Sequence, residues 1–269
     1  MIAQLLIFLA VGCVTGVLAG LLGIGGGTVV VPTVTFALMA LGADPDIVMK
    51  VAVGTSFATI MFSTLSSALA HYKKGGFDKG LAMKMAGGAV VGVFVGSWVA
   101  RFLSNQILLL MFCVFLAYVI FNMIKSASNP DESNVKPIPG GAYVGIGGVI
   151  GFISSFIGIG GGVLIVPVLS KMGHKVRTAI GISSSVGVFI SVVGALSAVY
   201  HGWGIGNLPP YCLGYVYLPA FFGLAITSAI FAPFGAKLAY KLPVKRLRQF
   251  FAVFLTFVLF NLLYKMFVG

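Results

Sequence analysis

The chain has 269 residues, of which 59% are hydrophobic and only 8% are charged, and its mean hydropathy is +1.10. Because a soluble domain is normally about 25% charged, this composition excludes an ordinary soluble protein and predicts an integral membrane protein. The formal net charge of +12 does not indicate a nucleic-acid partner, because the basic residues gather at the ends of apolar segments, where membrane topology explains them.

The first half of the chain contains five apolar segments. Residues 2–22 are predicted to be a retained membrane span rather than a signal peptide, because no positively charged region precedes them. Residues 28–41 are also apolar, but as a helix they would measure about 21 Å, which is shorter than a hydrocarbon core of roughly 30 Å. Longer segments follow at 47–71, 80–102 and 106–124. Residues 1–124 form the first predicted unit.

The second half repeats this order after a polar linker. Residues 125–140 contain Ser, Asn, Pro, Asp, Glu and Lys, a composition typical of a connecting segment. Residues 141–269 form the second predicted unit, and its five segments are expected at 141–157, 163–171, 178–200, 213–236 and 246–267.

One glycine motif occurs in both halves. Gly23-Ile24-Gly25-Gly26-Gly27 returns as Gly158-Ile159-Gly160-Gly161-Gly162, and each copy leads into a short apolar run that contains a proline, Pro32 or Pro167. Glycine clusters break helices, and a bilayer tolerates broken backbone only where protein buries it or where it lines a cavity. We therefore interpret the chain as two copies of one unit built around a broken helix pair.

The lysine and arginine residues predict the orientation. If the two segments beside each glycine break return to the same side of the membrane, 14 of the 17 basic residues fall on the side of the linker. The positive-inside rule then makes that side cytoplasmic and places both termini outside. Because each unit has an odd number of segments, the second unit is expected to be inverted. The predicted fold is all-α, with about eight full spans and two short or re-entrant helices.

The glycine breaks are the first candidate substrate site. The short helices that follow them present free N–H groups and positive dipole ends, which favour an anion. The residues expected to line this site are Gly25, Gly26, Gly27 and Thr28 in the first copy and Gly160, Gly161, Gly162 and Val163 in the second. The alternative is close helix packing, and we adopt that interpretation for six small residues at helical spacing: Gly12, Gly16, Gly20, Gly147, Gly151 and Ser155.

Hydroxyl groups are the second candidate feature. Thr55 and Ser56 lie in the third segment, and Ser183 and Ser184 lie in its counterpart. A hydroxyl can donate to an anion without the cost of a buried charge. The alternative is bonding to the backbone or to a neighbouring helix, which is common for serine and threonine in membranes.

Charged residues are the third candidate feature. Lys50 and Arg177 occupy matched positions at the starts of matched helices, where they either attract anions to each mouth or lie at the interface as snorkelling side chains. The histidines His71 and His201 are expected at the interface in contact with water. The five acids, Asp44, Asp46, Asp78, Asp131 and Glu132, all fall in loops or in the linker. Nothing therefore indicates a metal site, a cofactor, a buried proton relay or an enzyme.

The chain resembles the TauE/SafE family of sulfite exporters, also called the toluene sulfonate uptake permease family. The resemblance spans the full length and rests on residues 20–32, on their second copy at 155–167, and on Gly54-Thr55-Ser56. It implies a prokaryotic inner-membrane transporter of small, often sulfur-containing anions such as sulfite, sulfoacetate, thiosulfate or organosulfonates. The second copy has Ile182 where the first has Thr55, so the two halves are not fully symmetric.

The expected function is secondary transport of a small anion by alternating access between the halves. A passive anion channel and a non-transporting membrane scaffold are the two alternatives. The expected partners are a small anionic substrate and membrane lipid, without nucleic acid. The identity of the anion, the direction of transport, the coupling ion and the oligomeric state are not predicted.

Overall fold

The structure is a computed structural model that describes residues 2–23, 25–74, 78–125, 139–239 and 244–268, almost all of them in or between α-helices. Most of the linker predicted at 125–140 lies outside these residues. The elements are α1 (Ile2–Leu22), α2 (Gly27–Ala40), α3 (Val48–Tyr72), α4 (Lys79–Ala100), α5 (Asn105–Lys125), α6 (Gly140–Ile157), α7 (Gly162–Lys171), α8 (Val176–Gly202), β1 (Cys212–Leu213), β2 (Val216–Tyr217), α9 (Leu218–Ala239) and α10 (Val244–Val268).

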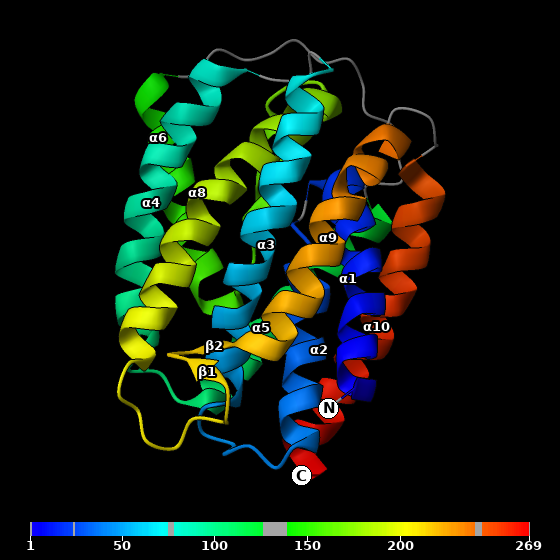
Figure 1. Ribbon diagram of the computed structural model, residues 1–269. Helices are drawn as coiled ribbons and strands as arrows, with labels where there is room; N and C mark the ends of the chain where they lie inside the picture. The colour runs from blue at the N-terminus through cyan, green and yellow to red at the C-terminus, as the bar shows by residue number, and fades with distance from the viewer. Residues whose placement is uncertain (1, 24, 75–77, 126–138, 240–243, 269) are drawn as a thin grey trace.

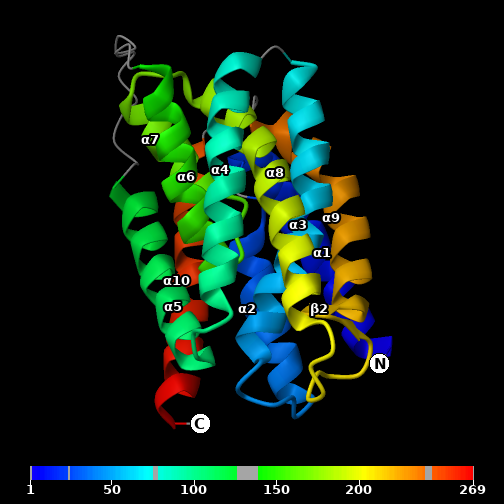
Figure 2. The ribbon, with the colours of Figure 1, turned by 90° about the vertical axis from the view of Figure 1, so that its left-hand side faces the viewer.

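The helices form one elongated bundle (Figures 1 and 2). α1 begins and α10 ends at the same end of the bundle, which we call the terminal end. α5 ends and α6 begins at the opposite end, which we call the linker end. α2 returns to the terminal end after α1, and α7 returns to the linker end after α6. Each broken helix pair therefore begins and finishes at one end, and the two pairs use opposite ends.

The closest helix contacts join the two halves of the sequence. α1 packs along α9, and α4 packs along α6. Gly12, Gly16 and Gly20 of α1 lie directly against the backbone of α9, while Gly147 and Gly151 of α6 lie against the backbone of α4. Small residues permit this approach because a Cβ would collide with a neighbouring carbonyl. The predicted helix-contact faces are confirmed at these glycines.

Seven of the helices are long and apolar enough to cross a membrane, namely α1, α3, α4, α5, α6, α8 and α9. In the described chain α2, α7 and residues Phe251–Lys265 of α10 form shorter apolar helices. The protein is therefore a multi-pass, all-helical membrane protein. The prediction that 28–41 and 163–171 are short helices is confirmed, with each helix starting one residue earlier than expected.

One boundary prediction was wrong. The segment expected at 213–236 begins as the antiparallel pair β1 and β2, and α9 starts only at Leu218. The turn between the two strands requires Gly214, whose φ of +55° is disfavoured for residues with a side chain. The backbone N–H of Tyr217 also donates to the Thr55 hydroxyl at 2.9 Å, so α3 holds this strand in place.

The glycine breaks take the predicted form. α2 is preceded by Gly26 at φ 83° and α7 by Gly161 at φ 73°, both in the left-handed region. Pro32 and Pro167 then lie inside the two short helices. Because proline has no N–H, the carbonyls four residues earlier, those of Thr28 and Val163, receive no helical hydrogen bond. The repeated sequence therefore loosens the same turn of backbone twice.

Candidate functional site

The two glycine breaks meet inside the bundle. A Cβ placed on Gly27 would lie 2.5 Å from the carbonyl oxygen of Gly158 and 3.1 Å from the Cα of Ile159. A Cβ on Gly25 would lie 3.9 Å from the Cα of Gly160. All of these residues are buried. The structure therefore brings together the two predicted halves of the site, and glycine at position 27 makes the close approach possible.

Each break accepts a hydrogen bond from one serine of the opposite half of the chain. Ser56 of α3 donates to the carbonyl of Gly158 at 2.6 Å, and Ser183 of α8 donates to the carbonyl of Gly23 at 2.9 Å. The sequence pairs Ser56 with Ser183 and Gly23 with Gly158, so the two bonds are reciprocal. Both predicted serines thus lie at the breaks. They bond to the backbone, which the sequence analysis gave as the alternative to anion binding.

The first turns of α2 and α7 carry unused hydrogen-bonding capacity. Neither Gly26 nor Gly161 provides a side-chain cap for the N–H groups of the following helix. Thr28, in the first turn of α2, is completely buried, and its hydroxyl has no partner among the described residues. Buried polar groups are normally hydrogen-bonded, so an unpartnered hydroxyl beside N–H groups without a side-chain cap leaves donors that a polar ligand could use. Val163 is the buried counterpart in α7.

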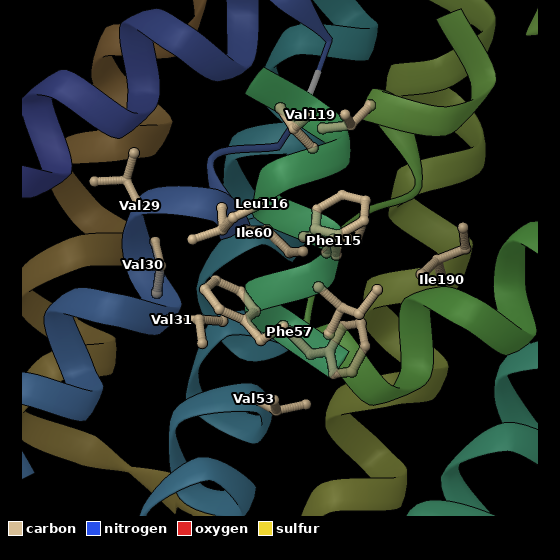
Figure 3. Close-up of a cluster of buried hydrophobic side chains, with 14 of the residues drawn as sticks. Val29, Val30, Val31, Val53, Phe57, Ile60, Phe115, Leu116, Val119 and Ile190 are labelled. Atoms are coloured by element: carbon tan, nitrogen blue, oxygen red, sulfur yellow. The ribbon is translucent and has the colours of Figure 1, made fainter. Parts of the chain in front are cut away.

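Apolar side chains surround this turn of α2. In Figure 3, Val30 and Val31 of α2 lie near Phe57 and Ile60 of α3 and near Leu116 of α5. All five side chains are buried. A small ligand at the breaks would therefore be dehydrated and would depend on backbone and hydroxyl donors.

Thr55 and Ser184 lie in the same helices but do not join the breaks. Thr55 donates to the carbonyl of Val51 at 2.6 Å and accepts from the N–H of Tyr217, so it anchors the β1–β2 turn. Ser184 is 3.0 Å from the hydroxyl of Ser67, a contact between α8 and α3. These two predicted hydroxyls are bonded within the protein in this structure.

Lys50 and Arg177 occupy opposite ends of the bundle, as their matched positions predict. Arg177 lies in the first turn of α8 at the linker end, where its side chain is exposed. Lys50 lies in the first turn of α3 at the terminal end, and it lines a cavity of about 50 Å³ together with Arg101 and His201. Arg101 was not predicted from the sequence as a site residue, although its position just after α4, at the same end as Lys50, was available as a signal.

The expectation that His71 contacts water at the interface was wrong. This residue is not at a wetted interface, because its side chain is only 1% exposed and its Nε2 lies 3.0 Å from the carbonyl oxygen of Gly20. The end of α3 packs against the end of α1 there, which removes the imidazole from water. His201 is half-buried at the other end and faces the cavity.

The acids within the described residues lie outside the helices. Asp78 caps α4 by accepting from the N–H of Leu81 at 3.0 Å. The N–H of Asp46 and the amide of Asn207 hold the pKa of Asp44 below its usual value. In the described chain no group of three or more His, Cys, Asp or Glu side chains comes together to hold a metal. Asp131 and Glu132 fall outside the described residues.

Comparison with known proteins places the chain among membrane transporters. Residues 8–262 match the family described as Sulfite exporter TauE/SafE. A probable membrane transporter protein of Haemophilus influenzae is 37% identical over 98% of this chain and 100% of its own length. Another, from Methanocaldococcus jannaschii, is 31% identical over 90% of this chain and 89% of its own. No solved structure is detectably similar.

Proposed function

The chain belongs to the TauE/SafE sulfite exporter family, and from this premise we propose that it is a secondary transporter of a small anion. The proposed substrate class is a sulfur oxyanion or an organosulfonate, of the sulfite, sulfoacetate or thiosulfate type. The proposed mechanism is alternating access between the two halves. Membership of a membrane transporter family also implies that the protein is not an enzyme.

The observation that carries this proposal is the meeting of the two glycine breaks. The first break reaches the bundle interior from the terminal end, and the second reaches it from the linker end. Transporters built from inverted repeats bind their substrates where broken helices from opposite sides meet near the middle of the membrane. This arrangement supports 1–124 and 141–269 as inverted repeats, with α2 and α7 as the returning arms.

The proposed substrate ligands are the N–H groups at Gly25–Thr28 and Gly160–Val163, with the Thr28 hydroxyl beside them. Ser56 and Ser183 are proposed to join them from α3 and α8. A serine hydroxyl has one proton, so each serine must release its glycine carbonyl before it donates to an anion. Thr55 and Ser184 would support this site through the bonds that position α3 and α8.

Counterflow in proteoliposomes tests the transport proposal. Vesicles loaded with unlabelled sulfite should accumulate labelled sulfite transiently against its gradient, and uptake should saturate. Saturable uptake without counterflow would favour a passive channel. A non-transporting scaffold predicts neither flux nor any anion-dependent change in thermal stability across sulfur oxyanions, carboxylates and halides.

The proposed location is the prokaryotic inner membrane, with both termini outside. Single cysteines in a cysteine-free background test this orientation. A cysteine at Asn207, at the terminal end, should react with an impermeant thiol reagent in intact cells, whereas one at Lys175, at the linker end, should not. The reverse pattern would invert the proposed topology.

A further inference from the structure

A small cavity opens at the terminal end of the bundle, separate from the glycine turns. It lies between α3, α4, α5, α6 and α8 and has a volume of about 50 Å³. A water molecule takes about 30 Å³ of liquid, while pockets for drug-sized ligands measure about 300–1,000 Å³. The cavity therefore suits an ion of a few heavy atoms rather than a large organic molecule.

The charges around this cavity have one sign. The charged residues that line it are Lys50 and Arg101, beside the imidazole of His201, and none of its described lining residues is an aspartate or a glutamate. Burial raises the pKa of Tyr215, which also lines the cavity, so its phenol stays neutral. An anion that enters meets fixed positive charge with no competing carboxylate on the wall.

The two cationic groups are held in place by the protein itself. Lys50 Nζ donates to the carbonyl oxygen of Arg101 at 3.2 Å, which uses one of its three donors. The guanidinium carbon of Arg101 lies 4.4 Å from the ring centre of Phe102 and 5.4 Å from that of Trp98. A guanidinium that rests on aromatic rings keeps the donors at its edge available for an oxyanion.

An apolar layer separates the cavity from the second glycine break. Val53, Phe57 and Phe156 line the cavity, and all three side chains are buried. A Cβ on Gly158 would lie 3.0 Å from the Cα of Val53, so this layer touches the break directly. Figure 3 shows Val53 and Phe57 close to Val31 of α2. A single layer of apolar side chains thus lies between the cavity and the second glycine break.

We propose that this cavity is a second anion site, an entrance vestibule where a small dissolved oxyanion binds to Lys50 and Arg101 before it passes Val53, Phe57 and Phe156 to reach the glycine breaks. The proposal relies on transport only for the identity of the anion and for its onward path. Binding in the vestibule is a property that can be measured by itself.

Trp98 offers a built-in reporter, because it lies beside Arg101 and the chain has only one other tryptophan, Trp203. The full chain carrying Trp203→Phe is purified in detergent and titrated with methanesulfonate at constant ionic strength, and Trp98 emission is recorded. We expect a saturable change. Arg101→Gln, and separately Lys50→Gln, should raise the half-saturating concentration by at least about tenfold, since each removes a charged donor.

The matched control is Lys265→Gln. Lys265 also rests on an aromatic ring, with Nζ 5.2 Å from the ring centre of Phe36, but it does not line the cavity. This variant should titrate like the unchanged chain. Gly26→Val should stop transport yet keep the Trp98 response, so a failure of the transport proposal is distinguishable from a failure of this one.

Two results would overturn the vestibule. The first is an absent response in folded Trp203→Phe protein, or a response that Arg101→Gln and Lys50→Gln leave unchanged. The second is a response to phosphatidylglycerol in nanodiscs without any response to dissolved methanesulfonate, which would make the cavity a site for a lipid headgroup. In vesicles, the vestibule predicts that Arg101→Gln raises the KM for uptake while the maximal rate changes little.

Discussion

The two glycine breaks share one backbone design but differ in the side chains around them. Both have a left-handed glycine before the short helix and a serine from the other half on a glycine carbonyl. At three positions beside the first break, a hydroxyl residue is matched by an aliphatic residue beside the second. The pairs are Thr15 and Ile150, Thr28 and Val163, and Ser63 and Ile190.

The two copies of the repeat therefore share their backbone geometry and their serine bond, and they differ in the other side chains around the break. The first break receives an additional bond, from the Ser63 hydroxyl to the carbonyl of Gly25 at 3.0 Å. At the second break, a Cβ on Gly161 would lie 2.8 Å from Ile190 and 3.1 Å from Ile150. Both breaks are therefore expected to offer backbone donors and one serine from the other half, while the first break adds the unpartnered Thr28 hydroxyl in the first turn of its short helix. An anion should bind off-centre, closer to α2.

The largest expected effect follows from blocking either break. Gly26→Val and Gly161→Val place a side chain on left-handed backbone, and at Gly26 the new Cβ would lie 3.1 Å from the Thr15 carbonyl. Both variants should abolish counterflow. Gly87→Val in α4 is the control, because its Cβ meets nothing within 4 Å and the variant should transport normally. Transport by well-folded Gly26→Val protein would rule out the breaks as the substrate site.

The next largest effect is expected from Thr28→Val, which gives the first break the valine that the second break has at Val163. Without anion, the variant should be more thermally stable, since it removes a buried hydroxyl that has no partner among the described residues. Its affinity for the anion should fall by about 1.5–3 kcal/mol, the range for hydrogen bonds to charged groups. Thermal unfolding with and without sulfite measures both effects. Unchanged affinity would remove Thr28 from the site.

Ser56→Ala and Ser183→Ala test the part that the breaks share. Each removes one bond to a glycine carbonyl, so each should lower stability by about 0.5–1.5 kcal/mol. Anion affinity should fall by about the same amount, because the serine must first exchange its carbonyl for the anion. Equal losses in the two variants would support the reciprocal design. If one serine were silent in both assays, the two breaks would not be functionally paired.

A smaller effect is expected outside the breaks. Asp78→Ala removes the cap of α4 and should cost about 0.5–2 kcal/mol of stability. Counterflow per folded molecule should not change, even when Asp44, Asp46, Asp131 and Glu132 are also replaced by alanine, since the described acids lie away from the breaks. Lost transport in well-folded protein would show that one of these carboxylates takes part in coupling.

The smallest effect concerns acid pH. Asp44 has a folded-state pKa below its ordinary value of 3.8, first because the N–H of Asp46 donates to it and then because Asn207 does. A depressed pKa contributes stability above the ordinary value, and this contribution is lost as pH falls through the folded pKa. Asn207→Ala should therefore lower the unfolding temperature slightly at neutral pH, and this difference should disappear as pH falls through the folded-state pKa of Asp44. A pH-independent difference would contradict this assignment.

The positions of the two breaks were predictable from the sequence, because a glycine cluster is a local signal. The repeated five-residue motif located both breaks, and the spacing of Gly12, Gly16 and Gly20 located a packed helix face. The pairing of α1 with α9 was not predictable, since nothing local specifies a partner helix. The cluster of Lys50, Arg101 and His201 was missed for a similar reason, because these residues are far apart in the sequence and come together only in the fold.

The most direct test of the central claim is a structure of the protein with selenite, an analogue of sulfite whose selenium is located by anomalous scattering. The account predicts a selenium peak within hydrogen-bonding distance of the first turn of α2, next to the Thr28 hydroxyl and facing the first turn of α7. A further peak beside Lys50 and Arg101 would mark the vestibule. Selenium at the vestibule alone, with Gly27 still packed dry against Gly158, would contradict the account.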